Sequence, residues 1–325
     1  MTTRTQFFDH YWAELARLGM DAVILHSWQD MPEKIRSDVD YAVTGCKSTF
    51  VISHLIDFCE THNWYLVQVI EHEPDAFYCV CMNNGGDRET LALDFTIDYR
   101  RLGHLLIRSH DLHEGSYKPT GKKFHVPSPG AELAYLLAKA AAKNKPFQDI
   151  ASRLDELLKQ DYPDCLKKLD TILKLRLNTS LNHGDLLEEI EQWFTAADAF
   201  KKIRSGRKFG AKEIWLYSKR IFQPTGLRLK LTGYSECMQN IEWVLNSIAP
   251  LFRRCTVVKN NRLFSKIRSL ALVIKTSLVV DTNSRSVLEC KDWTCSVVCD
   301  EKTNHKDIRD AIIEHMNTRI KRRYR

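Results

Sequence analysis

The stretch Ser37-Asp38-Val39-Asp40-Tyr41-Ala42-Val43 places two carboxylates one residue apart at the start of an apolar run. Residues i and i+2 of an extended strand point to the same face of a sheet, so Asp38 and Asp40 are expected to lie side by side. A third acid, Asp94, interrupts another apolar run, Leu93-Asp94-Phe95. Three carboxylates on one sheet face repel one another unless positive charge lies between them. The pattern therefore predicts a divalent-metal site on neighbouring strands.

Phosphoryl chemistry is the use of such a site that the pattern favours. Two Mg²⁺ ions carrying a nucleoside triphosphate would supply the missing positive charge. Asp98 competes with Asp94 for the third position, because residues i and i+4 share a strand face; the apolar neighbours of Asp94 favour it. The alternative is a strand edge decorated with solvated acids.

The composition is that of an ordinary globular protein, with 325 residues, 44% hydrophobic and 27% charged. No stretch reaches the roughly 18 apolar residues that a membrane span needs. The N-terminus, Met1–Gln6, lacks the apolar core of a signal peptide. The ten cysteines are scattered without a zinc-type spacing, so we expect a cytoplasmic protein with free thiols.

The net charge of +7 is concentrated in two places. The stretch Lys201–Lys230 holds ten Lys or Arg and the single acid Glu213, and the chain ends with Arg319–Arg325. Basic stretches bind phosphates of a nucleotide, a sugar nucleotide, RNA or lipid headgroups, although a solvated surface gives the same composition. Arg100-Arg101 and Lys122-Lys123 offer the same two interpretations, an acidic-substrate groove or a solvated surface.

Hydrophobic periodicity predicts an α/β fold in three parts. Residues 1–127 read as a mixed sheet with helices packed on it, with a hairpin turn at Asn83–Asp87. Residues 128–205 read as helical, opened by Ser128 as N-cap and Pro129 in the first turn. Residues 206–325 read as a second, mostly parallel α/β domain. The predicted elements are helices at 7–19, 49–61, 133–143, 238–248 and 307–322, and strands at 22–25, 38–43, 64–70, 77–82, 90–97, 227–231, 255–258, 270–280 and 296–299.

Residues 20–145 resemble the nucleotidyltransferase fold. That family has a Gly-Ser or similar pair after its first strand, about ten residues, Asp-x-Asp on the second strand and a third acid on a later one. Here the first position holds Leu25-His26-Ser27, the second Asp38 and Asp40, and the third Asp94. The chain departs from the family at His26, where glycine is usual.

The resemblance implies roles for these residues. Asp38 and Asp40 would bind the metal that carries the nucleotide, and Asp94 would hold a second metal and help deprotonate the attacking hydroxyl. The candidates for nucleotide binding are Ser27, Ser37, Lys139 and Lys143. His26 reads as a general base or as a polar residue capping a strand end, and Trp28 as a base-stacking or a core residue.

The C-terminal part is similar to thymidylate-kinase-like P-loop domains, which follow a nucleotidyltransferase-like half in proteins of bacterial surface-polysaccharide clusters. The similarity rests on Leu229–Gly233 followed by a helix, on Ala249–Arg254 before a strand, and on the terminal helix Ile312–Arg319. A working P-loop reads G-x-x-x-x-G-K-[ST]. Gly233–Asn240 lacks its second glycine, lysine and hydroxyl. The resemblance therefore implies a pseudokinase.

Four functions follow as hypotheses. The first is a metal-dependent nucleotidyltransferase acting on a hydroxyl or phosphate acceptor, in surface glycan assembly. The second is a catalytically decayed protein that binds a nucleotide or phosphosugar as a scaffold. A glycosyltransferase would place its Asp-x-Asp later than Asp38, after about a hundred residues of nucleotide-binding fold. An RNA-modifying nucleotidyltransferase would use the basic tail, but no RNA-binding module accompanies it.

Overall fold

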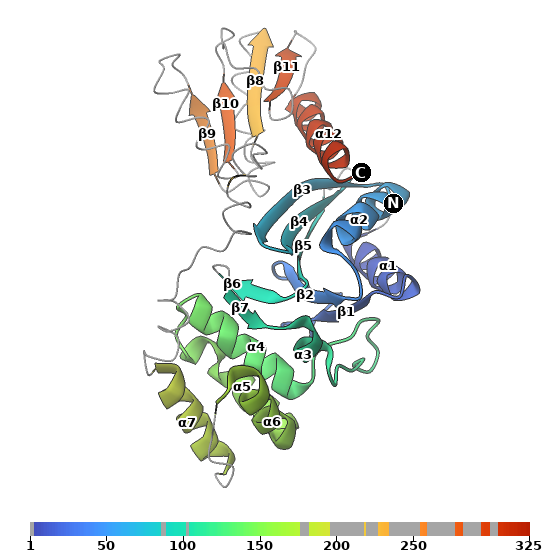
Figure 1. Cartoon of the computed structure of the whole chain (residues 1–325). Helices are drawn as coiled ribbons and strands as arrows, with labels where there is room; N and C mark the ends of the chain where they lie inside the picture. Colours follow the sequence, from blue (N-terminus) through green and yellow to red (C-terminus); the bar gives the residue numbers. More distant parts are fainter. Residues whose placement is uncertain are drawn as a thin grey trace.

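The computed structural model describes residues 3–85, 89–101, 104–175, 182–195, 218, 227–233, 254–258, 277–281, 294–299 and 305–325. It is a mixed α/β molecule with a mixed five-stranded sheet, a group of helices and a parallel four-stranded sheet (Figure 1). Among the described residues no helix is long and apolar enough to cross a membrane.

The five-stranded sheet has the order β1-β2-β5-β4-β3. β2 pairs antiparallel with β1 and parallel with β5, and the β5-β4-β3 part is antiparallel. The prediction of a mixed sheet is confirmed. Its strands are β1 (Asp21–Ile24), β2 (Val39–Thr44), β3 (Trp64–Glu73), β4 (Ala76–Asn83) and β5 (Thr90–Thr96).

One face of this sheet is apolar and closed by α1 (Arg4–Arg17) and α2 (Ser48–Thr61). Alternate residues of β2 and β5, such as Tyr41 and Phe95, point into this core and are fully buried. The hydroxyls of Tyr11 and Tyr41 lie 2.8 Å apart inside it. The stability of the sheet therefore rests mainly on this face.

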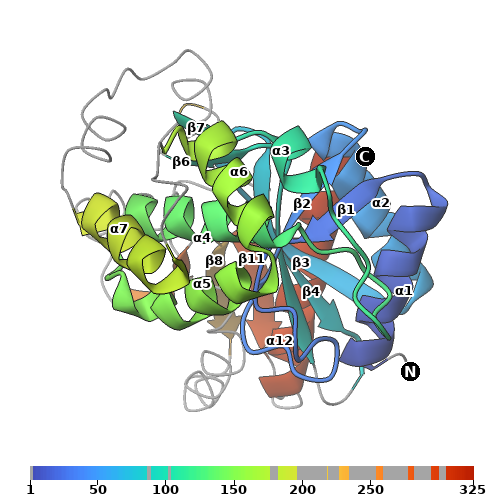
Figure 2. The ribbon, with the colours of Figure 1, turned by 90° about the horizontal axis from the view of Figure 1, so that it is seen from below.

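The opposite face is covered in two separate places. Over β1 and β2, Val23 and Ala42 pack against Tyr135 and Ala138 of α4 (Pro129–Ala142). Over β3 and β4, the apolar residues pack against the C-terminal part of the chain. Figure 2 shows α1 and α2 on one side of the sheet and α4 on the other. The central strand β5 lies between the two covered regions.

A short hairpin and a helix follow β5, and the sequence analysis did not predict them. These elements are β6 (Tyr99–Arg101), β7 (His104–Ile107) and α3 (Ser109–His113). Strands of three and four residues are too short to show an alternating pattern. The hairpin matters because it extends from the strand that carries Asp94.

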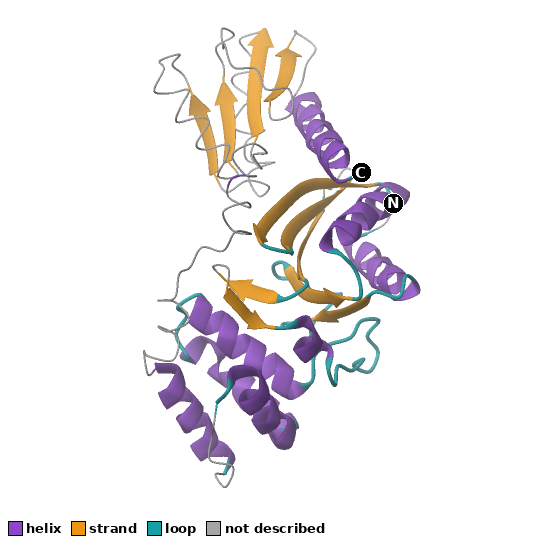
Figure 3. Cartoon of the chain, in the orientation of Figure 1, coloured by secondary structure: helices purple, strands orange, loops and turns teal. Residues whose placement is uncertain are grey.

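The described residues between 129 and 195 form helices, as predicted for this part of the chain (Figure 3). Ser128 caps α4 by accepting from the Ala131 amide at 3.4 Å. Gly130 permits a close approach to α6, because a Cβ at this position would collide with the backbone of Asp164. The further helices are α5 (Gln148–Gln160), α6 (Tyr162–Leu173) and α7 (His183–Thr195).

The four described strands of the C-terminal sheet all pair in parallel, with the order β11-β8-β10-β9. Its strands are β8 (Leu227–Gly233), β9 (Arg254–Val258), β10 (Ser277–Asp281) and β11 (Thr294–Cys299). The prediction of parallel strands here is confirmed. The predicted helix 238–248 and the P-loop stretch after Gly233 lie outside the described residues, as does most of the basic stretch 201–230.

The terminal helix α12 (His305–Tyr324) connects the two sheets. Its residues Ile312 and Met316 share an apolar cluster with Val67 of β3 and Leu229 of β8. Its last turn reaches α2, where Lys321 Nζ lies 2.5 Å from Glu60 Oε1. Arg325 also pairs with Glu60 and with Asp57, each at 2.5 Å. The last residues of the chain therefore complete the packing of the N-terminal sheet.

Candidate metal centre

The structure brings the three aspartates of the sequence pattern together. Asp40 and Asp94 are direct partners in the parallel β2–β5 pairing, and Asp38 immediately precedes β2. One carboxylate oxygen from each of Asp38, Asp40 and Asp94 lies within 4.8 Å of the others. Because these residues alternate with the buried apolar ones, they occupy the sheet face opposite α1 and α2. We call Asp38, Asp40 and Asp94 the carboxylate triad.

Asp40 is the buried member of the triad, with 9% of its surface exposed. Lys139 Nζ donates to its Oδ1 at 2.8 Å, and Tyr135 donates to the same oxygen at 3.4 Å. His26 Nε2 lies 2.9 Å from its Oδ2. Burial alone would raise the pKa of Asp40, but the hydrogen bond from His26 and the charge of Lys139 outweigh it and hold this pKa well below its ordinary value. Asp40 is therefore ionised at neutral pH.

His26 and Lys139 form one unit with Asp40. Lys139 Nζ also lies 2.7 Å from His26 Nε2, and His26 Nδ1 lies 2.8 Å from the hydroxyl of Ser27. A neutral imidazole nitrogen either donates or accepts, so Nε2 donates to Asp40 in one tautomer and accepts from Lys139 in the other. The sequence analysis missed this link because 113 positions separate His26 from Lys139.

Asp94, the third aspartate of the triad, has different neighbours from Asp40. Asp94 Oδ1 lies 2.8 Å from His72 Nε2, and both side chains are part exposed, at 24% and 35%. Asp98, the competing residue, accepts from the Ser109 amide at 3.0 Å and from Arg100 at 3.1 Å. Asp98 therefore stabilises the segment from β6 to α3 and is not part of the triad. His72 gave no signal in the sequence.

The remaining predicted residues are distributed unevenly around the triad. Ser27 is exposed and has φ 55°, a left-handed conformation that is unusual for serine. Ser37 is exposed, and its hydroxyl donates to the carbonyl of Asp38 at 3.4 Å. Lys143 stands at the exposed C-cap of α4, one turn beyond Lys139, and the structure describes no hydrogen bond from it to the triad.

A buried ion pair fixes the loop that follows Ser27. Glu132 of α4 is 1% exposed and accepts from Trp28 Nε1 at 3.1 Å. Arg153 of α5 donates to both oxygens of Glu132, at 2.9 and 3.0 Å, and its guanidinium lies 5.9 Å from the centre of the Trp28 ring. A bidentate pair holds its partners in one geometry. Trp28 is thus held as a structural anchor between two helices.

The triad has the donor chemistry of a magnesium site. Carboxylate oxygens are the hard ligands that Mg²⁺ prefers. Lys139 pairs with only one of the three carboxylates, that of Asp40, and Asp38 and Asp94 remain as ligands for a cation. Each carboxylate oxygen has two lone pairs, so Asp40 retains acceptor capacity besides its bonds to His26 and Lys139. The residues present fit a divalent cation.

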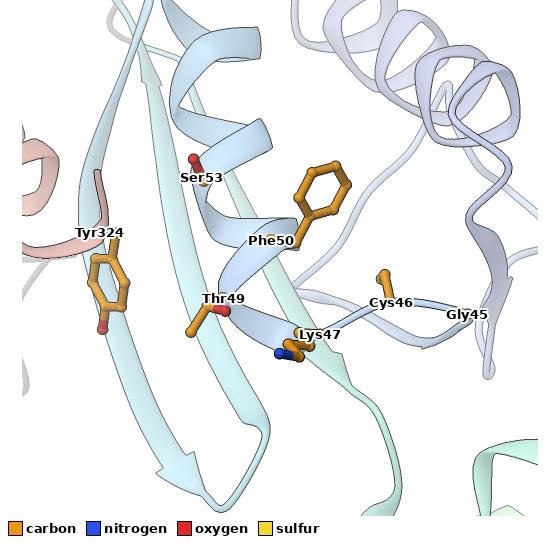
Figure 4. Close-up of a pocket in the computed structure, with 7 residues that line it drawn as sticks. All are labelled: Gly45, Cys46, Lys47, Thr49, Phe50, Ser53 and Tyr324. Atoms are coloured by element: carbon orange, nitrogen blue, oxygen red, sulfur yellow. The ribbon is translucent and has the colours of Figure 1, made fainter.

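A pocket of about 560 Å³ lies elsewhere, at the start of α2 (Figure 4). Tyr324 of α12 stands across it from Thr49 and Ser53 of α2. None of the predicted site residues lines this pocket. Its lining is Gly45, Cys46, Lys47, Thr49, Phe50, Ser53 and Tyr324.

Three comparisons were made with known proteins. The chain matches no family model, no curated protein and no solved structure.

Proposed function

We propose that this protein is a divalent-cation-dependent nucleotidyltransferase, which transfers a nucleoside monophosphate to a hydroxyl or phosphate acceptor. The observation that carries the proposal is the carboxylate triad, with its ligand atoms within 4.8 Å of one another. The mixed sheet and Lys139 on the helix that covers it also support the proposal. The magnesium ions and the nucleoside triphosphate are part of the proposal.

Each residue has a proposed part in the reaction. Asp38 and Asp40 would hold the cation that carries the nucleotide, and Asp94 would hold a second one. When bound, such a pair of ions stabilises the attacking and leaving oxygens of an in-line displacement. Asp94, oriented by His72 at 2.8 Å, would accept the proton of the attacking hydroxyl. Ser27, Ser37 and Lys143 are proposed to bind the phosphates from the rim.

The experiment is a thermal-shift screen of the full chain with each nucleoside triphosphate, with and without Mg²⁺. We expect at least one triphosphate to raise the melting temperature only when Mg²⁺ is present. The double variant Asp38→Asn with Asp40→Asn should lose this response. Asp30→Asn, an exposed loop residue paired with Arg36, is the matched control and should keep it. A wild type with no metal-dependent response to any triphosphate would overturn the proposal.

A second candidate function is a nucleotide- or phosphosugar-binding protein without turnover. One observation favours it: both oxygens of Asp40 already have partners, His26 and Lys139. A pyrophosphate-release assay separates the two candidates, since only the enzyme releases pyrophosphate from a bound triphosphate. In a decayed enzyme, nucleotide binding persists while the wild type and the His26→Gly variant both release none.

For the C-terminal part we propose a degenerate kinase-like unit that transfers no phosphate. Its parallel strand order supports a comparison with nucleotide-binding α/β sheets, since the connections from β8 and β10 run in opposite directions. Replacement of Gln239, in the altered P-loop stretch, is expected to leave nucleotide binding unchanged. A role in surface glycan assembly in the cytoplasm remains part of the proposal, and the neighbouring genes test it.

A further inference from the structure

Two buried donors beside the carboxylate triad have no partner of their own. The hydroxyl of Tyr99 and the Nε of Arg101 are both shielded from solvent, and neither makes a hydrogen bond to a described residue. Tyr99 and Arg101 stand at positions i and i+2 of β6, and the charge of Arg101 acts on the hydroxyl of Tyr99. Buried donors are normally satisfied, because an unpaired one carries a free-energy cost.

These donors lie next to the proposed reaction centre. The ring of Tyr99 packs edge-on against Tyr135, with the centroids 4.9 Å apart, and Tyr135 donates to Asp40. β6 starts three residues after β5 ends, and β5 carries Asp94. Tyr99 therefore packs against a residue that contacts the triad directly.

The electrostatics of neighbouring groups supports this placement. Burial raises the pKa of Tyr99, the charge of Arg101 acts in the opposite direction, and Asp40 and Asp94 add to the rise. Partial burial of the ammonium group of Lys143, and then the charges of Lys139 and Arg101, lower its pKa. The charges of Arg101 and Lys139 thus act together on Lys143, which lies one turn beyond Lys139 on α4.

Arg101 has no lone pair to offer a metal, and the donors of Tyr99 and Arg101 together suit an anion. An arginine has donors only, in a planar fork that matches phosphate oxygens, and a tyrosine adds a single neutral donor. We propose that Tyr99 and Arg101 form a phosphate subsite beside the triad, so that a substrate of this centre presents a phosphate group to these two side chains. The inference rests on the proposed function for the identity of the centre. The phosphate belongs either to the nucleotide or to the acceptor.

The same hairpin contains a matched control. Arg100 lies between the two residues in sequence. Its guanidinium donates to Asp98 at 3.1 Å and is thus already engaged. Arg101→Gln and Arg100→Gln remove the same charge from adjacent positions, and only the first removes a donor of the proposed subsite.

The test measures the thermal stabilisation of the full chain by inorganic phosphate at constant ionic strength. We expect Arg101→Gln to weaken the apparent affinity for phosphate about tenfold, the size of one charge-assisted hydrogen bond. Arg100→Gln should bind as the wild type does. Tyr99→Phe should weaken binding several-fold, and it keeps the test decisive if Arg101→Gln fails to fold. Equal affinity in the Arg101→Gln, Tyr99→Phe and Arg100→Gln variants would overturn the inference.

A second titration with ATP and Mg²⁺ identifies the source of the phosphate. If Arg101→Gln loses the response to phosphate and keeps that to ATP with Mg²⁺, the subsite serves the acceptor; if it loses both, the subsite serves the triphosphate. Failure of the proposed function has a different signature. The wild type would then respond to inorganic phosphate through Arg101 and show no metal-dependent response to any triphosphate.

Discussion

The two faces of the five-stranded sheet are built from the same strands and have opposite properties. In β2 the neighbours Asp40 and Tyr41 point in opposite directions, the first toward the triad and the second into the closed aromatic core. β5 repeats the arrangement with Asp94 and Phe95. The period of two along a strand thus places stabilising side chains and mutually repelling ones at adjacent positions. The apolar face supplies the stability that allows three carboxylates to gather on the other.

The largest effect is expected from the apolar face. Phe95→Ala should lower the free energy of unfolding by about 3–5 kcal/mol, because it leaves a cavity beneath the aromatic side chains of Tyr41 and Phe77. Denaturant titration measures this change. Leu105→Ala, at a position that is 41% exposed, is the control and should change stability by about 0.5 kcal/mol or less. Equal losses in the two variants would mean that the apolar face does not dominate stability.

The second effect concerns the hydrogen bond between the hydroxyls of Tyr11 and Tyr41 in that core. Tyr41→Phe should cost about 1–3 kcal/mol, since the hydroxyl of Tyr11 would remain buried without its partner at 2.8 Å. Replacing both tyrosines by phenylalanine removes both polar groups, so the double variant should lose less than the sum of the single losses. A double-mutant cycle from denaturation midpoints measures the coupling. Additive losses would show that the two hydroxyls are independent.

A substitution in the carboxylate triad, on the opposite face, should raise the free energy of unfolding instead of lowering it. Without metal, Asp94→Asn is expected to raise the free energy of unfolding by up to about 1 kcal/mol, because it removes charge repulsion within the triad. With Mg²⁺ the variant should be less stable than the wild type, because it has lost a metal ligand. Melting temperatures in chelator and in Mg²⁺ report both changes. A metal-free variant less stable than the wild type would contradict the contrast between the faces.

The smallest effect is expected at the charged rim where α12 meets α2. Hydrogen bonds from Lys321 and Arg325 lower the pKa of Glu60, and the side chain is 40% exposed, so Glu60→Gln should cost at most about 1 kcal/mol. A lowered carboxyl pKa stabilises the fold above the ordinary value of 4.5, and this stabilisation is lost as the pH falls through the folded-state pKa. The difference between wild type and variant should therefore vanish in acid. Denaturation at a series of pH values measures it, and a constant difference would contradict the ion pair.

Local pattern was sufficient to predict most of the described strands and helices and all three carboxylates of the triad. The i, i+2 rule placed Asp38 and Asp40 together, and the apolar neighbours of Asp94 distinguished it from Asp98. Sequence could not supply the contacts between distant segments. His26 meets Lys139 only because α4 folds back over β1, which is a property of the packed molecule. The β6–β7 hairpin has strands too short for periodicity to detect.

The docking of α12 has a practical consequence for dividing this chain into fragments. A fragment that ends near residue 127 would expose the apolar residues of β3 and β4, including Val67, that α12 covers in the whole molecule. Supplying residues 305–325 as a separate peptide should restore solubility to such a fragment, in the manner of split-protein complementation. Fragment boundaries chosen only from the order of segments in the sequence would separate β3 and β4 from α12, although these elements are neighbours in space.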